Sequence, residues 1–383
     1  MSPKSRILLI DDQPELALAS MSVIREDIEP LHPKDLDDEH LRDVTLVLVD
    51  HQLEDRYWTD RSEMPFVGRP MDGLAVASII RAHLRSDRFE RHPPVGIALF
   101  SAKLSKVTPG FKNPPEHLAA RTADLEWAFN KSDAATGAPQ AQRVKELAEA
   151  ISHLAMRWET RAIQANEEAW SDLEKLLGLS TEVEWNPAAR LQIERCHPPM
   201  HEMAEWTDGL AVVRWLAQRI LPYPTFLIDE RHLALRLGIQ PKSFQEALQA
   251  SPQFAEAIQS ARYTGILSEF LGKRWWSTGI DSLIWTATQG KSMTIDEVRR
   301  WLQNFTEITL AQCSDEYTLI VGPDAEQTEE IAPFDQCVQI QPDDWPPYAK
   351  PAWTTIERAK HDARLRAWVT ASDIEKINQD VID

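Results

Sequence analysis

Cysteine is scarce in this chain, which has only three, Cys196, Cys313 and Cys337, among 383 residues. Cysteines that are few, odd in number and far apart match neither a disulfide framework nor the ligand spacing of a zinc site. Reduced thiols are expected instead, as in cytoplasmic proteins. No apolar run approaches the roughly 20 residues that cross a membrane, and no signal-peptide pattern opens the sequence. These absences predict a cytoplasmic protein without a membrane-spanning segment.

Basic residues are also few, with 41 Lys and Arg against 60 Asp and Glu and a net charge of −19. Domains that bind DNA normally cluster Lys and Arg to neutralise phosphates, and no such cluster follows residue 155. A helix–turn–helix pattern does occur at 229–250, with a turn at Gly238. Its second helix carries Lys242 and Glu246, whose charges cancel. A DNA-binding regulator is therefore an alternative and not the favoured interpretation.

Four short apolar runs in the first third of the chain predict buried strands of a parallel sheet. They occupy residues 6–10, 44–49, 95–100 and 125–129, with helical patterns between them. Polar residues stand at or just after the end of each run: Asp11, Asp12, Asp50, Ser101 and Lys131. Because ligands bind at the carboxyl ends of such strands, these five side chains are expected to converge on one site.

The residue types at this predicted site indicate phosphoryl transfer. Three carboxylates in one cleft repel each other, and a hard cation such as Mg²⁺ with oxygen ligands relieves that repulsion. A carboxylate can itself act as the nucleophile and form an aspartyl phosphate. Asp50 would attack, Lys131 would pair with the phosphoryl oxygens, and the Ser101 hydroxyl would donate a hydrogen bond to one of them.

The chain from about residue 4 to 155 resembles the receiver domains of bacterial two-component response regulators. The matching stretches are Ile7-Leu8-Leu9-Ile10-Asp11-Asp12, Leu46-Val47-Leu48-Val49-Asp50, Met71-Asp72-Gly73-Leu74, Leu99-Phe100-Ser101-Ala102 and Asn130-Lys131. The resemblance implies a flavodoxin-like α/β fold with a five-stranded, doubly wound parallel sheet at 4–140. It also implies a histidine kinase as partner and Asp50 as phosphoacceptor. Mg²⁺ would be held by Asp11, Asp12, Asp50 and the Gln52 backbone carbonyl, while Ser101 and Lys131 would report the phosphorylation state.

Three departures from the receiver pattern stand out. Gly73 lies 23 positions after Asp50, whereas receivers usually place this glycine within about ten, so residues 51–70 contain an insertion. A long loop beside an active site is often functional, and its Tyr57, Trp58 and Phe66 would form a lid. The position that normally carries an aromatic switch residue is Ala128, and Ser132 replaces the usual proline. A degenerate receiver that serves only as a binding scaffold is therefore an alternative.

Residues 141–177 contain neither proline nor glycine and predict a long connecting helix. The apolar positions recur at steps of three and four, close to a heptad seam: Val144, Leu147, Ile151, Leu154, Trp158, Ala162, Ala165, Ala169, Leu173 and Leu176. This pattern is compatible with a coiled coil that forms a parallel homodimer. The alternative is a long helix that packs on the chain's own C-terminal domain.

The rest of the chain predicts an α-rich α+β output region. Residues 178–306 have mainly helical patterns, and 307–383 predict a small β-hairpin, 308–313 with 317–321, a third strand at 336–340, and a Pro- and Trp-rich tail packed on the hairpin. The 14 tryptophans favour an interface or a Trp-rich core equally. No catalytic order of Ser, His and Asp occurs there. The expected protein is a response-regulator-like switch for an unidentified protein partner, and not an enzyme beyond its own phosphorylation; a signal-gated enzyme is the alternative.

Overall fold

The computed structural model describes residues 6–19, 21–53, 70, 72–86, 94–131, 140–158, 166–201, 210–290, 295–305, 310–311, 313 and 317–378. The chain forms two compact units that are not continuous in sequence. The first combines residues 1–177 with 198–222 and 265–272, and the second combines 178–197, 223–264 and 273–383. The first unit therefore includes two segments that come later in the chain than the predicted connecting helix.

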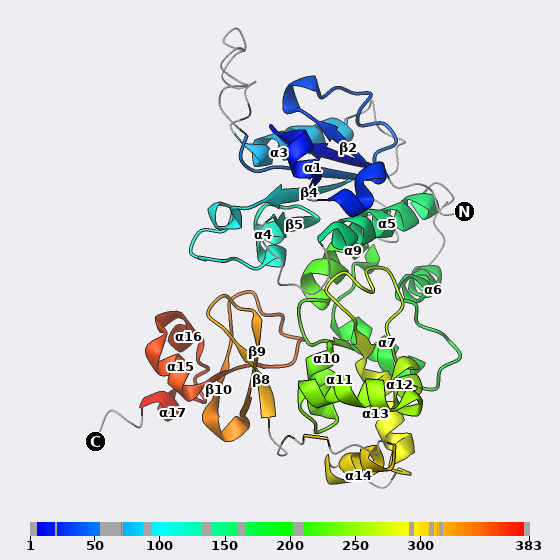
Figure 1. Cartoon of the computed structure of the whole chain (residues 1–383), viewed down its shortest axis with the longest axis vertical. Helices are drawn as coiled ribbons and strands as arrows, with labels where there is room; N and C mark the ends of the chain where they lie inside the picture. Colours follow the sequence, from blue (N-terminus) through cyan, green and yellow to red (C-terminus); the bar gives the residue numbers. More distant parts are fainter. Residues whose placement is uncertain are drawn as a thin grey trace. The chain divides into compact units, whose positions relative to one another are not determined.

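The first unit is built on a five-stranded sheet whose strands are all parallel (Figure 1). Its strands are β1 (Ile7–Ile10), β2 (Ile28–Leu31), β3 (Leu46–Val49), β4 (Gly96–Ser101) and β5 (Trp127–Asn130), in the order β2-β1-β3-β4-β5. This order is consistent with the predicted flavodoxin-like α/β fold. The sequence pattern missed β2, which is only partly buried and contains Pro30; proline is tolerated there because the strand lies at the edge.

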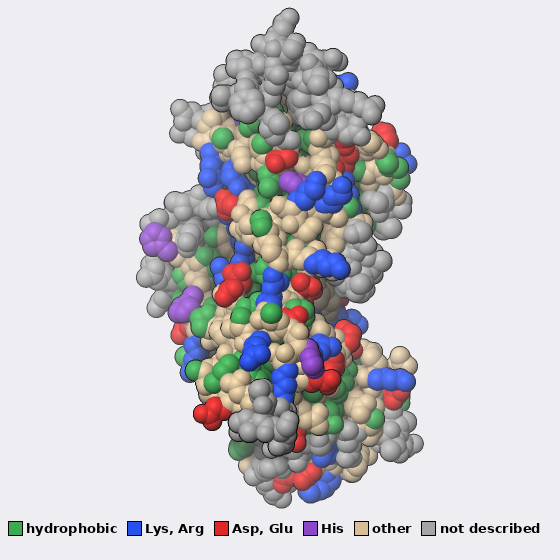
Figure 2. Space-filling view, turned by 90° about the vertical axis from the view of Figure 1, so that its left-hand side faces the viewer, with side chains coloured by type: hydrophobic (Ala, Val, Ile, Leu, Met, Phe, Trp, Pro, Cys, Tyr) green, Lys and Arg blue, Asp and Glu red, His purple; other side chains and the backbone are tan. Residues whose placement is uncertain are grey.

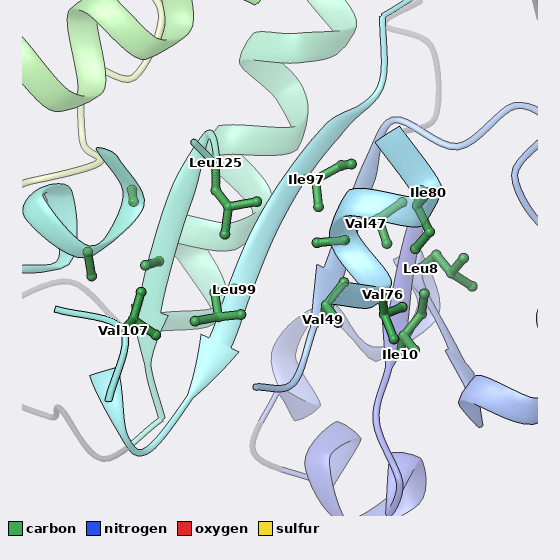
Figure 3. Close-up of a cluster of buried hydrophobic side chains, with 14 of the residues drawn as sticks. Leu8, Ile10, Val47, Val49, Val76, Ile80, Ile97, Leu99, Val107 and Leu125 are labelled. Atoms are coloured by element: carbon green, nitrogen blue, oxygen red, sulfur yellow. The ribbon is translucent and has the colours of Figure 1, made fainter. Parts of the chain in front are cut away.

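The core of this unit lies between the sheet and two helices, α3 (Gly73–Leu84) and α4 (Glu116–Thr122). Successive side chains of a strand point to opposite faces, so alternate residues share this core. Figure 3 shows Val47 and Leu8 beside Ile80 of α3. One turn earlier in this helix, Val76 lies beside Val49 and Ile10. Fully burying each such side chain stabilises the fold by roughly 1.5–3 kcal/mol. The packing fixes the strand ends that carry the polar residues.

Further helices complete the first unit: α1 (Pro14–Ala19), α5 (Gln140–Trp158), α6 (Asn166–Leu176) and the 3₁₀ turns η1 (Ser22–Asp27), η2 (Pro33–Asp35) and η5 (Leu104–Lys106). Helix α5 contacts the sheet through a hydrogen bond between the Thr45 and Ser152 hydroxyls at 3.3 Å. An added Cβ on Gly96 would lie 2.4 Å from Cδ1 of Ile151, so this helix packs closely on the strands.

The predicted long helix at 141–177 corresponds to two helices, α5 and α6, and residues 159–165 between them lie outside the described part. The apolar seam is buried within a single chain. Its buried members are Val144, Leu147, Ile151, Leu154, Ala169, Leu173 and Leu176, all at most 5% exposed. Intramolecular packing thus accounts for the pattern that motivated a coiled coil, and the homodimer stays a prediction.

The two later segments of the first unit cover the edge strand β5. Helix α9 (Ala211–Trp215) continues into a π-helical turn, η6 (Leu216–Ile220). The Gln218 amide nitrogen donates to the carbonyls of Leu125 and Glu126 at 2.7 and 2.8 Å. Leu125 and Glu126 immediately precede β5 at the edge of the sheet, where backbone groups lack a strand partner, and this glutamine satisfies two of them.

Ahead of its C-terminal sheet, the described residues of the second unit form six helices around an aromatic core: α7 (Asn186–Arg195), α10 (Glu230–Arg236), α11 (Pro241–Ala250), α12 (Pro252–Gln259), α13 (Ser277–Ala287) and α14 (Ile295–Phe305). Strands β6 (Leu227–Ile228) and β7 (Trp275–Trp276) form a short antiparallel pair. Trp275 and Trp276 are buried, and Trp276 stacks on Phe226 with ring centroids 5.5 Å apart. For these two tryptophans, the core interpretation holds. Trp285 is instead 53% exposed.

The C-terminal sheet differs from the predicted hairpin. It has four strands, β8 (Tyr317–Val321), β9 (Gln327–Pro333), β10 (Cys337–Ile340) and β11 (Ala352–Thr355), in the order β10-β11-β8-β9. Strand β8 pairs with β9 on one side and with β11 on the other, and half of the predicted partner 308–313 lies outside the described residues. In the described part of that stretch, Ala311 and Cys313 bond instead to the backbone of Gln240 and Gly238, in the loop between α10 and α11. The strand predicted at 336–340 corresponds to β10.

The predicted Pro- and Trp-rich tail is more ordered than expected. After β11, three short helices follow, α15 (Ile356–His361), α16 (Ala363–Trp368) and α17 (Ile374–Asn378), and a 3₁₀ turn, η7 (Phe334–Gln336), precedes β10. Thr355 and Asp362 cap α15 and α16 through their side-chain oxygens. Among the described helices, none combines the length and hydrophobicity needed to cross a membrane.

Candidate functional site

The structure brings the three predicted acids together at the carboxyl end of the parallel sheet. Asp11 and Asp12 follow β1 and Asp50 follows β3, where the Asp50 backbone N–H donates to the Ile10 carbonyl at 2.9 Å. One carboxylate oxygen from each of the three lies within 4.8 Å of the others. This spacing allows one cation to contact all three side chains.

The acids are buried, which distinguishes them from an ordinary acidic surface. Asp11, Asp12 and Asp50 are 3%, 9% and 8% exposed. Burial raises the pKa of Asp50, and repulsion from Asp11 adds to this, while Lys131 and the Gln52 backbone N–H oppose it. Charge crowded in a buried site is costly unless a cation compensates it.

Lys131 supplies part of that compensation. Its Nζ lies 2.8 Å from Oδ2 of Asp11 and 3.2 Å from Oδ1 of Asp50. It also lies over the ring of Phe100, 5.1 Å from the centroid. The Lys131 backbone N–H donates to the Ser101 carbonyl at 3.0 Å, which ties the ends of β4 and β5 together.

Ser101 lies beside this lysine, as predicted. The register of β4 and β5 pairs it with Asn130, the residue before Lys131. Ser101 is 1% exposed, and its hydroxyl oxygen accepts from the Lys103 backbone N–H at 3.3 Å. The structure therefore assembles Asp11, Asp12, Asp50, Ser101 and Lys131 at one end of the sheet, while the role of the Gln52 carbonyl stays a prediction.

The Asp72-Gly73 motif has a local structural role beside Asp50. The Asp72 carboxylate accepts from the Ala75 backbone N–H at 2.9 Å and caps α3. The Gly73 backbone N–H donates to the His51 carbonyl at 3.0 Å. A Cβ on Gly73 would lie 1.8 Å from the Asp50 carbonyl oxygen, so only glycine fits.

Gly73→Ala is expected to displace the backbone that carries Asp50 and to lower the free energy of unfolding by roughly 1–3 kcal/mol. Urea unfolding measures this change. Gly322→Ala serves as the control, because its added methyl would meet only Thr328 Cγ2 at 3.4 Å and the Glu326 carbonyl at 3.8 Å. Equal unfolding midpoints for Gly73→Ala and the wild type would contradict the close approach.

Sequence reasoning missed two buried groups near the site. His51 directly follows Asp50 and is 8% exposed, and burial lowers its pKa; its position in the chain was the available signal. Glu116 is also 8% exposed, but no local sequence pattern marks it. The predicted lid residues Tyr57, Trp58 and Phe66 lie outside the described residues.

The donor set suits a hard divalent cation. Three carboxylates offer oxygen ligands, and the acids lie close enough for a metal ion to bind between them. The resulting site could neutralise the negative charge of a phosphoryl group brought to Asp50. Sulfur and imidazole donors are absent from this acidic group.

The surface charge is mixed on the face that Figure 2 draws. Lys and Arg side chains are interspersed there with Asp and Glu over the described residues, although acidic residues are in excess in the sequence as a whole. Comparisons with models of known families, with curated proteins and with solved structures found no match to this chain. The geometry of the site is therefore the basis for a functional assignment.

Proposed function

We propose that this chain is a signalling protein that accepts a phosphoryl group on Asp50, in a Mg²⁺-dependent reaction, and thereby switches a protein-interaction output in its C-terminal region. The observation that carries the proposal is the buried group of Asp11, Asp12 and Asp50 with Lys131 in contact with two of them. A purely structural role would not require three crowded carboxylates at the carboxyl end of a parallel sheet.

The proposed reaction transfers a phosphoryl group from a phosphohistidine of a histidine kinase. An Asp50 carboxylate oxygen attacks phosphorus, the P–N bond breaks, and the departing imidazole takes up a proton. Asp11, Asp12 and Asp50 would hold the metal ion. When bound, Mg²⁺ supplies charge neutralisation for the phosphoryl oxygens.

Lys131 and Ser101 complete the proposed site. Once Asp50 carries the phosphoryl group, the Lys131 ammonium exchanges its contact with the Asp50 carboxylate for one with a phosphoryl oxygen. Ser101 donates its hydroxyl hydrogen to another phosphoryl oxygen, while its own oxygen can keep accepting from the Lys103 backbone N–H. These two changes convert the covalent modification into a change at the ends of β4 and β5.

Incubation of the full chain with a small radiolabelled phosphodonor such as acetyl phosphate is expected to label the protein in Mg²⁺. Omission of the metal in the presence of a chelator should abolish the label, because Lys131 alone does not offset three carboxylates and an incoming phosphoryl group. The label should be lost in mild alkali, as acyl phosphates are. A wild type that never labels would instead favour a binding scaffold without phosphoryl chemistry.

A further inference from the structure

Arg143 on α5 is a charged side chain held inside the first unit. It is 1% exposed, and its guanidinium carbon lies 5.6, 5.6 and 5.1 Å from the ring centroids of Trp127, Phe129 and Phe270. The Phe270 ring also meets Trp127 edge-on at 4.8 Å. Phe270 belongs to the 265–272 segment, which comes from far along the chain and joins this unit.

Two side chains of α5 bind the backbone of this segment. The Arg143 Nε donates to the Phe270 carbonyl at 3.1 Å, and a Glu146 carboxylate oxygen accepts from the Glu269 backbone N–H at 3.1 Å. Residues three apart share a face of a helix, so these contacts act together. At its start the segment is held by the Ile266 backbone N–H, which donates to the Leu176 carbonyl.

Arg143 also forms a buried ion pair with Glu116 of α4. The other oxygen of Glu116 accepts from the Asn130 backbone N–H at 2.8 Å, and the paired oxygen accepts from the Trp127 indole at 2.9 Å. Asn130 immediately precedes Lys131, whose ammonium contacts Asp11 and Asp50. Direct contacts therefore run from the acidic site through Glu116 and Arg143 to the backbone of 265–272.

We propose that Glu116 is a positioning residue for Lys131 and that the Glu116–Arg143 pair couples phosphorylation of Asp50 to the seating of the 265–272 segment. This inference rests on the proposed function. When Lys131 turns to the phosphoryl oxygens, the adjacent backbone of Asn130 shifts against Glu116. Separating a buried ion pair would leave an uncompensated charge in the interior, so Arg143 moves together with Glu116. Its hydrogen bond to the Phe270 carbonyl changes as a result.

The 265–272 segment can transmit a shift from the first unit to the second through the covalent backbone. The chain continues on both sides of it, at Thr264 and at Lys273, directly into the second unit. A shift of 265–272 therefore reaches the C-terminal region through the backbone itself. Because coupling between two sites is reciprocal, the seating of the segment also alters the affinity of the acidic site for the phosphoryl group.

Hydrogen exchange of the wild-type peptide 265–272, with and without Mg²⁺ and beryllofluoride, tests this inference without any substitution. Occupation of the acidic site is expected to change the exchange rates of the Glu269 amide, which bonds to Glu146, and of the neighbouring Phe270 amide by at least about fivefold. Beryllofluoride binding without any change in this peptide would overturn the coupling and leave the proposed function intact. If neither beryllofluoride binds nor phosphodonor labels, the proposed function fails and the inference falls with it.

Two substitutions of Glu116 distinguish its role in positioning Lys131 from a general contribution to stability. Glu116→Gln keeps an acceptor for the Asn130 N–H, so labelling should stay within about threefold of wild type, whereas Glu116→Ala should slow it about tenfold. Both should lose the exchange response at 265–272, because neither pairs with Arg143. Identical labelling by both variants would overturn the positioning role.

Arg214→Gln is the matched control. Arg214 also joins a later segment to the strand β5, through Glu126, but at the opposite end of that strand from Lys131. The variant removes the ion pairs of Arg214 with Glu126 and Asp124. It leaves intact the series of contacts that runs from Asn130 through Glu116 and Arg143 to Phe270, so its exchange response should persist. Loss of the response in Arg214→Gln as well would attribute the effect to general loosening and would overturn the inference.

Discussion

Asp50→Asn is expected to abolish acceptance of a phosphoryl group and, in the absence of divalent metal, to make the protein more stable. The first effect follows because an amide is not a competent nucleophile for this reaction. The second follows because the substitution removes one of three crowded buried charges, while Lys131 keeps its contact with Asp11 at 2.8 Å. A gain of about 1 kcal/mol is expected, or roughly 2–4 °C in Tm.

The stability gain of Asp50→Asn should depend on pH, in a direction that can be checked. The folded-state pKa of Asp50 is raised, mainly by burial, so wild-type stability falls as pH rises from the ordinary aspartate pKa through the folded value. The advantage of Asp50→Asn should therefore be present near pH 7 and vanish at low pH, where Asp50 is protonated in both states. Calorimetry across this range measures it. A variant less stable than wild type at pH 7 would contradict the account of crowded charge.

The double change Asp11→Asn and Asp12→Asn is expected to weaken Mg²⁺ binding by at least about 100-fold, since two of three carboxylate ligands are replaced by neutral amides. Isothermal titration or metal-dependent thermal shifts would measure the loss. Wild-type affinity should also fall as pH drops through the raised pKa of Asp50, because protons and metal compete for that oxygen. The control is Asp72→Asn, which leaves the three-acid group intact and alters the cap of α3.

An unchanged metal affinity in the double variant would place the cation elsewhere. Loss of binding in the double variant alone would instead assign the metal to the group that Asp11, Asp12 and Asp50 form. Because both substituted residues lie at the end of β1, far-UV spectra of the variant should confirm that the sheet still forms.

Much of the first unit could be predicted because its signals are local. β1, β3, β4 and β5 are short apolar runs that each end at or just before a polar residue, and parallel strands bring their carboxyl ends together. Because of this geometry, the sequence alone predicted that Asp11, Asp50 and Lys131 lie together at one end of the sheet. β2 was missed because it is half exposed at the sheet edge and contains Pro30.

The features that could not be predicted depend on contacts between distant segments. Nothing near Phe270 in the sequence indicates that it packs on Trp127 and Arg143 of another part of the chain. Likewise, the strand 317–321 was assigned a neighbour at 308–313 because that stretch has a strand-like composition, whereas the structure pairs it with β9 and β11. In the described part of 308–313, Ala311 and Cys313 bond to Gln240 and Gly238. Composition sets a propensity, and tertiary contacts decide the partner.

The alanine at position 128 illustrates the same limit. Its lack of an aromatic ring left the predicted mode of signalling open. In the structure Ala128 belongs to the core that α3 and α4 cover, while Trp127 and Phe129 lie against Arg143 on α5. The aromatic groups of β5 are therefore engaged with the chain's own 265–272 segment, which the sequence pattern alone did not reveal.

Chemical localisation of the phosphoryl group tests the central claim most directly. Borohydride reduces an aspartyl phosphate to homoserine, and peptide mass spectrometry then identifies the position. After treatment of the wild type with a small phosphodonor in Mg²⁺, homoserine is expected at position 50 and at no other aspartate. Modification at another residue, or a phosphate that survives mild alkali on a hydroxyl side chain, would contradict the assignment of Asp50 as phosphoacceptor.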